Sequence, residues 1–220
     1  MGPYRKSRLR THLREKLSRY YASTYGDRGA EKLSASARIR GQLFRDWAGT
    51  GKRILDVGCG SGTVTRFVTE GNKVTGIDVD KQALDACQKR YGVKPVWGEF
   101  ANELPFGEAS FDVVLATETI EHLPYPRILL SEVRRVLTAG GLFLGSVPNE
   151  YSLKNRIRVL QGKPMSRDPT HLHHFSLASL RALLTQEFVL EEIAAVRGKW
   201  RNLSPSLWAH YFAWRCRRSA

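Results

Sequence analysis

The sequence is poor in cysteine and lacks any long hydrophobic run. Its three cysteines, Cys59, Cys87 and Cys216, are too few and too scattered for a disulfide framework or a four-cysteine zinc site. No apolar run approaches the roughly 20 residues that a membrane-spanning helix needs. These absences argue against a disulfide-rich scaffold and a transmembrane protein. We therefore expect a globular protein of the reducing cytoplasm.

Acidic residues are scarce at both ends of the chain. Residues 1–40 hold 11 Lys and Arg against 3 Asp and Glu, and residues 151–220 hold 12 against 4. Residues 41–150 are slightly acidic, with 12 basic against 14 acidic side chains. Basic flanks suit an anionic small molecule, peripheral contact with an anionic membrane, or RNA. Solvated basic helices would give the same composition, so charge alone does not choose among these partners.

The first 23 residues are rich in arginine and poor in acids. This pattern predicts an amphipathic helix over residues 5–22, which would cover the active site or touch an anion. A mitochondrial-type presequence would have a similar composition and stays an alternative.

Strand-like apolar runs alternate with helical patterns through the middle of the chain. This alternation predicts βαβ units and a doubly wound α/β fold with helices on both faces of a parallel sheet. The predicted strands cover residues 52–58, 73–79, 94–100, 111–117 and 140–148, and the predicted helices cover 5–22, 30–48, 62–70, 81–92 and 126–138.

The pattern changes after Pro148, where a polar segment predicts an irregular insertion with one helix. A helix capped by Ser176 and a strand over 188–196 follow. Residues 207–218 fit either a basic amphipathic helix or a strand, and we favour a strand that completes the sheet. We expect one domain made of an N-terminal helical cover (1–48), a cofactor-binding core (49–148), a substrate-side insertion (149–172) and C-terminal helix and strands (173–220).

The stretch ILDVGCGSGTVTRF, residues 54–67, ends an apolar run in Asp56 and then places glycine at every second position. A strand, a glycine turn and a helix form a cradle for a nucleotide, because glycine lets ligand atoms approach the backbone. The dinucleotide fingerprint needs a further glycine where this chain has Thr63, and no Walker lysine follows. The pattern therefore disfavours an NAD-type dehydrogenase and a phosphate-loop protein.

Two acidic residues follow the next two strands. Asp78 lies 20 residues after Gly58, at a strand end where a carboxylate can accept hydrogen bonds from both ribose hydroxyls. Glu99 ends the third strand, where it could face an adenine amino group while Phe100 packs against the ring. Each acid alone could be a helix cap or a surface charge, but the set favours nucleoside binding.

The segments LDVGCGSG, VTGIDVD, GEFANELPF, SFDVVLATETIEHL and VLTAGGLFLGSVPN occur in this order over about residues 52–149. In sequence and order they resemble the class I S-adenosylmethionine-dependent methyltransferases. The resemblance implies a Rossmann-like sheet of seven strands, mostly parallel, whose last strand runs antiparallel. It also implies S-adenosylmethionine as the cofactor.

The resemblance assigns parts of the cofactor to particular residues. Asp56 and the glycine loop would hold the methionine part, Asp78 the ribose, and Glu99 with Phe100 the adenine. Ubiquinone-biosynthesis O-methyltransferases carry a cofactor-binding arginine about 20 residues before the loop, which implies that Arg38 pairs with the methionine carboxylate. The implied cofactor-binding residues are Arg38, Asp56, Gly58, Cys59, Gly60, Gly62, Asp78, Val79, Glu99, Phe100 and Thr117.

The segment ATETIEHLPYP also resembles the ubiquinone-biosynthesis O-methyltransferases. In those enzymes, as in RNA 3′-end 2′-O-methyltransferases, a Glu-x-x-Glu-His element and a later histidine hold a divalent metal. The resemblance implies a Mg²⁺ or Mn²⁺ site that lowers the pKa of an acceptor hydroxyl. Its ligands here would be Glu118, Glu121, His122 and His171. His122 as a metal-free catalytic base, or as a structural residue, stays an alternative.

We therefore expect a methyltransferase that acts on a hydroxyl of a small-molecule or lipid-intermediate acceptor with anionic or aromatic character. Methylation of an RNA ribose hydroxyl or base is the alternative that the basic flanks permit. A non-enzymatic basic scaffold is a third reading, which the intact set of Asp56, glycine loop and Asp78 argues against.

Overall fold

The computed structural model describes residues 33–166 and 168–219. The predicted helix over 5–22 lies outside these residues. The helix predicted over 30–48 is α2 (Ala35–Ala48), which begins later than expected because Ser34 is extended and forms its N-cap. Ser34 caps it, because its hydroxyl accepts a hydrogen bond from the Ala37 backbone N–H at 3.1 Å.

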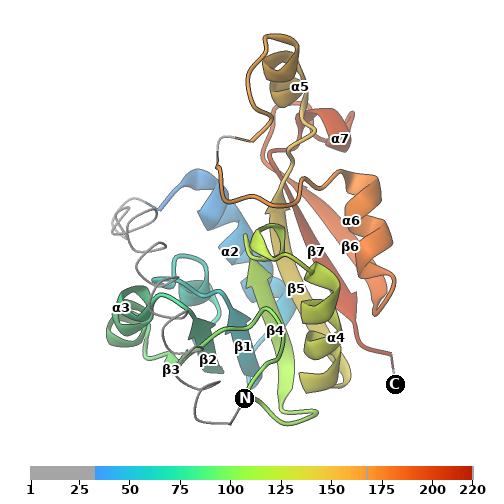
Figure 1. Cartoon of the computed structure of the whole chain (residues 1–220). Helices are drawn as coiled ribbons and strands as arrows, with labels where there is room; N and C mark the ends of the chain where they lie inside the picture. The colour runs from blue at the N-terminus through green and yellow to red at the C-terminus, as the bar shows by residue number, and fades with distance from the viewer. Residues whose placement is uncertain (1–32, 167, 220) are drawn as a thin grey trace, which may run out of the picture.

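A seven-stranded sheet forms the centre of the molecule, with strand order β3-β2-β1-β4-β5-β7-β6 (Figure 1). β7 is antiparallel to both of its neighbours, and all other pairs are parallel. The predicted doubly wound sheet with an antiparallel last strand is confirmed. The strands are β1 (Arg53–Val57), β2 (Lys73–Asp78), β3 (Lys94–Trp97), β4 (Phe111–Thr117), β5 (Leu137–Pro148), β6 (Val189–Val196) and β7 (Tyr211–Arg217).

Helices cover both faces of the sheet (Figure 1). Side chains alternate between the faces of a strand, so Ile54 packs in the core beneath α2 and α3, whereas Leu55 packs beneath α4 and α6. The remaining helices are α3 (Lys81–Tyr91), α4 (Pro126–Val136), α5 (Leu153–Leu160), α6 (Leu177–Leu184) and α7 (Pro205–Trp208), with 3₁₀ turns η1 (Thr65–Phe67) and η2 (Ile120–His122).

Several predicted boundaries are confirmed by their capping chemistry. α3 ends at Gly92, which adopts the left-handed conformation with φ 68° and ψ 19°. α6 begins after Ser176, whose side chain forms a capping box with Ser179. Residues 207–218, for which a helix was the alternative, contain strand β7.

Three other predicted elements differ from the structure. The third strand ends at Trp97 rather than at residue 100, since residues 98–100 form a bend and irregular structure. Residues 62–70 form no α-helix but only the turn η1, since the Thr65 hydroxyl donates to the Asp56 carboxylate at 2.7 Å and β-branched residues crowd the segment. The fifth strand begins at Leu137 rather than at residue 140. It runs through Gly140 and Gly141, where the pairing with β4 shifts register.

The parallel strands all end at one edge of the sheet. At this edge the last residue of β5, Pro148, pairs with Tyr211 of β7, which also pairs with Val196 at the end of β6. The segments that follow β5 and β6 therefore leave the sheet side by side. They carry α5 and α7, which stand above the sheet in Figure 1. A search of the described helices finds none with the length and apolarity needed to cross a bilayer.

Candidate active site

The glycine loop after β1 is shaped by backbone conformations that favour glycine. Gly58, Gly60 and Gly62 all have positive φ, of 74°, 50° and 83°. A Cβ at Gly58 would lie 2.8 Å from the Thr119 hydroxyl, so close packing also requires that glycine. A Cβ at Gly60 would meet no heavy atom of the described residues within 4 Å. Gly60 therefore borders open space at the end of β1, where a ligand can approach the backbone.

Asp56 is a buried carboxylate with one oxygen unused. Its side chain accepts the 2.7 Å hydrogen bond from Thr65, but Oδ1 has no partner among the described residues. Burial raises the pKa of Asp56 to about 7, against the effect of the Thr65 bond and with a contribution from the charge of Asp78. An unpaired buried acceptor is costly, so a cation or N–H donor from a ligand would stabilise it.

Asp78 is the last residue of β2, as predicted, whereas Glu99 lies just beyond β3 instead of ending that strand. Asp78 Oδ2 accepts from the Gly60 backbone N–H at 2.7 Å, and Oδ1 accepts from the Asp80 N–H at 2.8 Å. Burial raises the pKa of Asp78 despite these bonds. Glu99 Oε1 is buried and has no partner within the described chain. The edge thus presents carboxylate acceptors that match the amino, hydroxyl and N–H donors of S-adenosylmethionine.

The other residues predicted to bind the cofactor lie around the same edge. Phe100 is half-buried and packs against the core, and Thr117 is half-buried at the end of β4. The carbonyl of buried Val79 accepts from Trp97 Nε1 at 3.0 Å. The Cys59 side chain is buried beneath α3, and its Sγ lies 2.6 Å from where a Cβ on Gly76 would be. Cys59 therefore contributes to the packing of the loop.

The arginine of α2 that enters the site is Arg40, whereas Arg38 is exposed. Arg40 is buried and forms an ion pair with Glu118, and its guanidinium lies 4.1 Å from the centre of the Tyr211 ring. Burial raises the pKa of Glu118 more than Arg40 lowers it. Sequence reasoning missed Arg40, and the role proposed for Arg38 stays a prediction.

Three of the four predicted metal ligands lie together. One ligand atom from each of Glu121, His122 and His171 lies within 4.8 Å of the others. Glu118 is outside this group, because its carboxylate turns to Arg40. Both carboxylate oxygens of buried Glu121 lack hydrogen-bond partners among the described residues. This donor set of one carboxylate and two imidazoles fits a borderline divalent cation such as Mn²⁺ or Zn²⁺ better than Mg²⁺, which prefers oxygen ligands.

Burial and neighbouring charges set the protonation of the three groups. Burial, reinforced by the charge of Glu118, raises the pKa of Glu121 well above its usual value. Burial and the charge of His171 lower the pKa of His122, which favours the neutral imidazole at pH 7. Burial also acts to lower the pKa of His171, but the hydrogen bond that its Nδ1–H donates to the Glu150 carboxylate and the charges of nearby carboxylates outweigh burial, so the pKa of His171 is raised.

Residues that the sequence reasoning missed hold both histidines in place. His171 Nδ1 lies 2.9 Å from Oε1 of buried Glu150. His122 Nδ1 lies 3.0 Å from the hydroxyl of Thr170, which donates to Asp168 at 2.6 Å. Carboxylates that fix imidazoles in this way are common around metal ligands. Glu150 follows β5 closely, so the strand-end signal that identified Asp56 and Asp78 could also have identified it.

Comparisons with known proteins agree with this arrangement. A family model described as "Methyltransferase domain" matches residues 55–145. A Mycolicibacterium smegmatis protein named "Probable S-adenosylmethionine-dependent methyltransferase" is 33% identical over 148 residues, covering 66% of this chain and 55% of its own. A fatty-acid O-methyltransferase of the same species is 40% identical over 102 residues, covering 43% of this chain and 36% of its own. The chain thus spans about half or less of the length of these two relatives.

Solved structures with low sequence identity share the fold. A Burkholderia thailandensis 1,6-didemethyltoxoflavin-N1-methyltransferase, solved with S-adenosylhomocysteine, superposes with a TM-score of 0.68 at 22% identity, covering 100% of this chain and 92% of its own. A methyltransferase from Mesorhizobium loti gives 0.63 at 17%, covering 85% and 100%. These two structures support the fold alone. The matched family model, together with the strand order and the carboxylates around the glycine loop, identifies residues 55–145 as a methyltransferase domain of the class I S-adenosylmethionine-dependent type.

Proposed function

We propose that the chain transfers a methyl group from S-adenosylmethionine to a hydroxyl of a small-molecule or lipid-like acceptor, with help from a divalent metal. The observation that carries the proposal is the group of Glu121, His122 and His171 beside the cofactor loop. Thr119 joins the two, because its hydroxyl donates to the Val57 carbonyl at 3.0 Å just before the loop begins.

Several relatives support a hydroxyl or carboxyl acceptor of lipid type by their names. They include the fatty-acid O-methyltransferase and the phthiotriol/phenolphthiotriol dimycocerosates methyltransferase of Mycobacterium tuberculosis, which is 39% identical over 99 residues. A fungal relative is named O-methyltransferase resE and is 36% identical over 131 residues. These names support the acceptor class and leave the individual acceptor open.

In this proposal the residues of the chain have separate tasks. Asp56, Asp78 and Glu99 orient the cofactor through the acceptor oxygens described above. When bound, S-adenosylmethionine supplies a methyl group on a positively charged sulfur, and a divalent cation would lower the pKa of the acceptor hydroxyl. Neutral His122 either binds that cation or takes the proton of the acceptor hydroxyl in a metal-free reaction.

Methyl transfer to catechol and to a phenol with a long alkyl chain, each with Mn²⁺ or with EDTA, tests the proposal through formation of S-adenosylhomocysteine. Product that forms only when Mn²⁺ is present supports the metal-assisted reaction, and equal amounts of product in Mn²⁺ and in EDTA support His122 as the base. Methylation of RNA with no methylation of either small molecule would contradict a small-molecule acceptor.

Mn²⁺ binding to the full chain, measured by calorimetry, tests the ligand set without turnover. Glu121→Gln should weaken binding by about 10- to 100-fold, since it removes a charged ligand. Glu192→Gln is the matched control, because Glu192 is an exposed carboxylate on β6. Equal Mn²⁺ affinity in wild type and Glu121→Gln would contradict the site.

A further inference from the structure

The two segments that leave the sheet beside each other form a projecting tip, which we define as residues 151–166 and 197–208. They are joined at the base by Asn149, whose side-chain amide donates to the carbonyls of Ser206 and Ala209, each at 3.0 Å. The backbones of the tip also pack closely at Gly198, where there is no room for a side chain. A Cβ there would lie 1.8 Å from the Trp208 carbonyl oxygen, and the φ of Gly198 is 115°.

Several large apolar side chains of this tip face solvent. None of the eight residues of α5 is buried, although the helix carries Leu and Ile side chains. Leu160 is 87% exposed and Leu203 is 84% exposed, and Trp200 is 48% exposed. Trp200 also packs edge-on against Trp208, with ring centres 4.6 Å apart. Large apolar side chains gathered in one exposed place mark an interaction site rather than ordinary surface.

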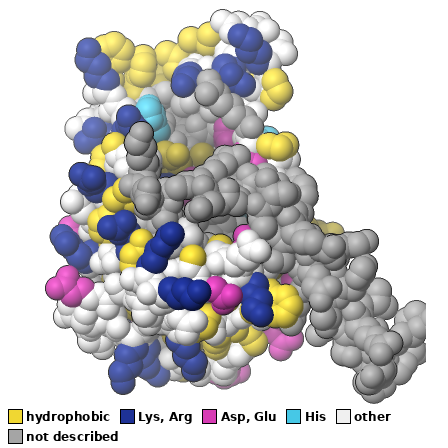
Figure 2. All heavy atoms as spheres, turned by 90° about the vertical axis from the view of Figure 1, so that its left-hand side faces the viewer, with side chains coloured by type: hydrophobic (Ala, Val, Ile, Leu, Met, Phe, Trp, Pro, Cys, Tyr) yellow, Lys and Arg dark blue, Asp and Glu magenta, His cyan; other side chains and the backbone are white. Residues whose placement is uncertain are grey.

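The charge of the tip has one sign. Its two segments contain no Asp or Glu, and their basic residues among the described positions are Lys154, Arg156, Arg158, Lys163, Arg197, Lys199 and Arg201. None of these seven pairs with a carboxylate of the described chain. At the top of Figure 2, basic and hydrophobic side chains lie next to each other over this tip.

We propose that the tip docks on an anionic lipid bilayer, with Leu160 and Leu203 in the interfacial region and the cations against the headgroups. Apolar side chains surrounded by lysine and arginine bind such surfaces through burial of apolar area and through attraction between the cations and the anionic headgroups. Tryptophan is also enriched at the membrane–water interface. Docking would bring the carboxyl edge of the sheet, with Glu150 and His171 at the base of the tip, close to the bilayer. The inference stands apart from methyl transfer, because neither cofactor nor acceptor is needed to test it.

A fluorophore at the tip reports docking directly. Leu160→Cys in the full chain can be labelled selectively with an environment-sensitive dye, because Cys59, Cys87 and Cys216 are all buried. We expect a blue shift of its emission with vesicles of phosphatidylcholine and phosphatidylglycerol, and a much smaller one with phosphatidylcholine alone. Val189→Cys is the matched control, since Val189 is 56% exposed at the start of β6, away from the tip, and its label should not shift.

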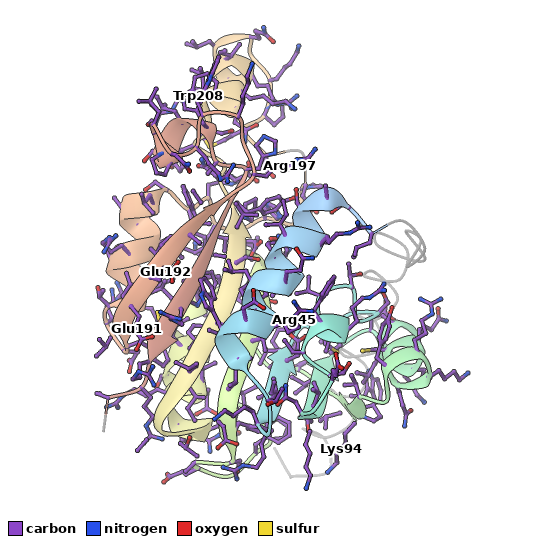
Figure 3. The ribbon with its side chains drawn as sticks, turned by 180° about the vertical axis from the view of Figure 1, so that it is seen from behind. Arg45, Lys94, Glu191, Glu192, Arg197 and Trp208 are labelled. Atoms are coloured by element: carbon purple, nitrogen blue, oxygen red, sulfur yellow. The ribbon has the colours of Figure 1, made fainter. Side chains whose placement is uncertain are left out.

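Charge variants test the electrostatic part of the proposal. Each Gln substitution at Lys154, Arg156 or Lys163 should lower the partition coefficient on the anionic vesicles about fivefold. Arg45→Gln and Lys94→Gln are the controls, because both side chains lie away from α5 and α7 (Figure 3), and salt screens the attraction between a distant cation and the headgroups. They should change partitioning by less than about twofold. Far-UV circular dichroism and thermal unfolding confirm that each variant is folded.

Three results would overturn the proposal. The first is no binding to anionic vesicles. The second is vesicle binding without a shift at the Leu160→Cys label, since another part of the chain would then make the contact. The third is tip variants that weaken binding of an RNA oligonucleotide while vesicle binding is unchanged, which would assign the tip to nucleic acid.

Discussion

Two regions at the same edge of the sheet leave different groups without partners. Around the glycine loop and η2, the unpaired groups are buried polar atoms on Asp56, Glu99 and Glu121. On the tip they are exposed apolar side chains, such as Leu160 and Leu203. Buried acceptors need small polar or cationic ligands, whereas exposed apolar groups need another apolar surface. The difference indicates that this edge of the sheet binds a small polar or cationic ligand in one region and an apolar surface in the other.

The two eight-residue helices α5 and α6 show the same contrast. Both follow a serine and both begin and end in leucine. α6 buries Leu180 and Leu184 against the sheet, whereas α5 buries nothing. Both segments therefore form a helix of the same length, and they differ in whether that helix packs against the sheet.

Truncation of one leucine in each helix should give the largest difference. Leu180→Ala should lower the free energy of unfolding by about 2–5 kcal/mol, because Leu180 is fully buried and a cavity would remain. Leu160→Ala should change it by less than about 0.5 kcal/mol. Urea unfolding of both variants measures this. Similar losses in the two would mean that α5 is packed in solution, and the contrast would fail.

Titration of Asp56 should give the next largest effect. Its folded-state pKa is raised to about 7, so its contribution favours the folded state at low pH and is lost as pH rises from about 4 to about 7. The shift corresponds to at most about 4 kcal/mol. Wild type should therefore lose more stability than Asp56→Asn between pH 5 and pH 8, as measured by urea unfolding at each pH. Parallel pH profiles for the two proteins would show that Asp56 is not buried in this way.

The helix caps should give the smallest effect. Ser176→Ala should cost about 1 kcal/mol, because the Ser176 hydroxyl accepts from the Ser179 N–H at 3.1 Å. Ser152→Ala should cost little, since no capping hydrogen bond is made by its side chain. Thermal unfolding compares the two. An equal loss of stability in Ser152→Ala would indicate that Ser152 caps α5 in solution as Ser176 caps α6, which would contradict the structure.

The sheet and the cofactor loop could be predicted because their signals are local. An apolar run that ends in Asp56 and a glycine at every second position leave few alternative conformations. The strand over residues 211–217 could be favoured over a helix because its aromatic residues alternate, and Phe212 and Trp214 are indeed both buried.

The acceptor side could be predicted only in part, because it depends on contacts between distant segments. The spacing of Glu118 and Glu121 suggests a shared face, but Glu118 has φ 56° and lies outside η2, so its side chain turns away from Glu121. Arg40 and Glu150 reach the site through α2 and the segment after β5. No spacing rule connects either residue to His122. Glu150 could have been considered from its place just after β5, but nothing in the sequence pairs it with His171, and Arg40 has no such signal.

Calorimetric titration with S-adenosylhomocysteine is the sharpest test of cofactor binding at this edge of the sheet. We expect the wild-type chain to bind it. Asp85→Ala should bind equally, because Asp85 is an exposed acid on α3, and Asp78→Ala should lose about 100-fold in affinity through removal of a charged acceptor. Adding Mn²⁺ and catechol should give further heat in wild type that EDTA removes. Failure of the wild-type chain to bind S-adenosylhomocysteine would contradict the assignment of this edge as a methyltransferase active site.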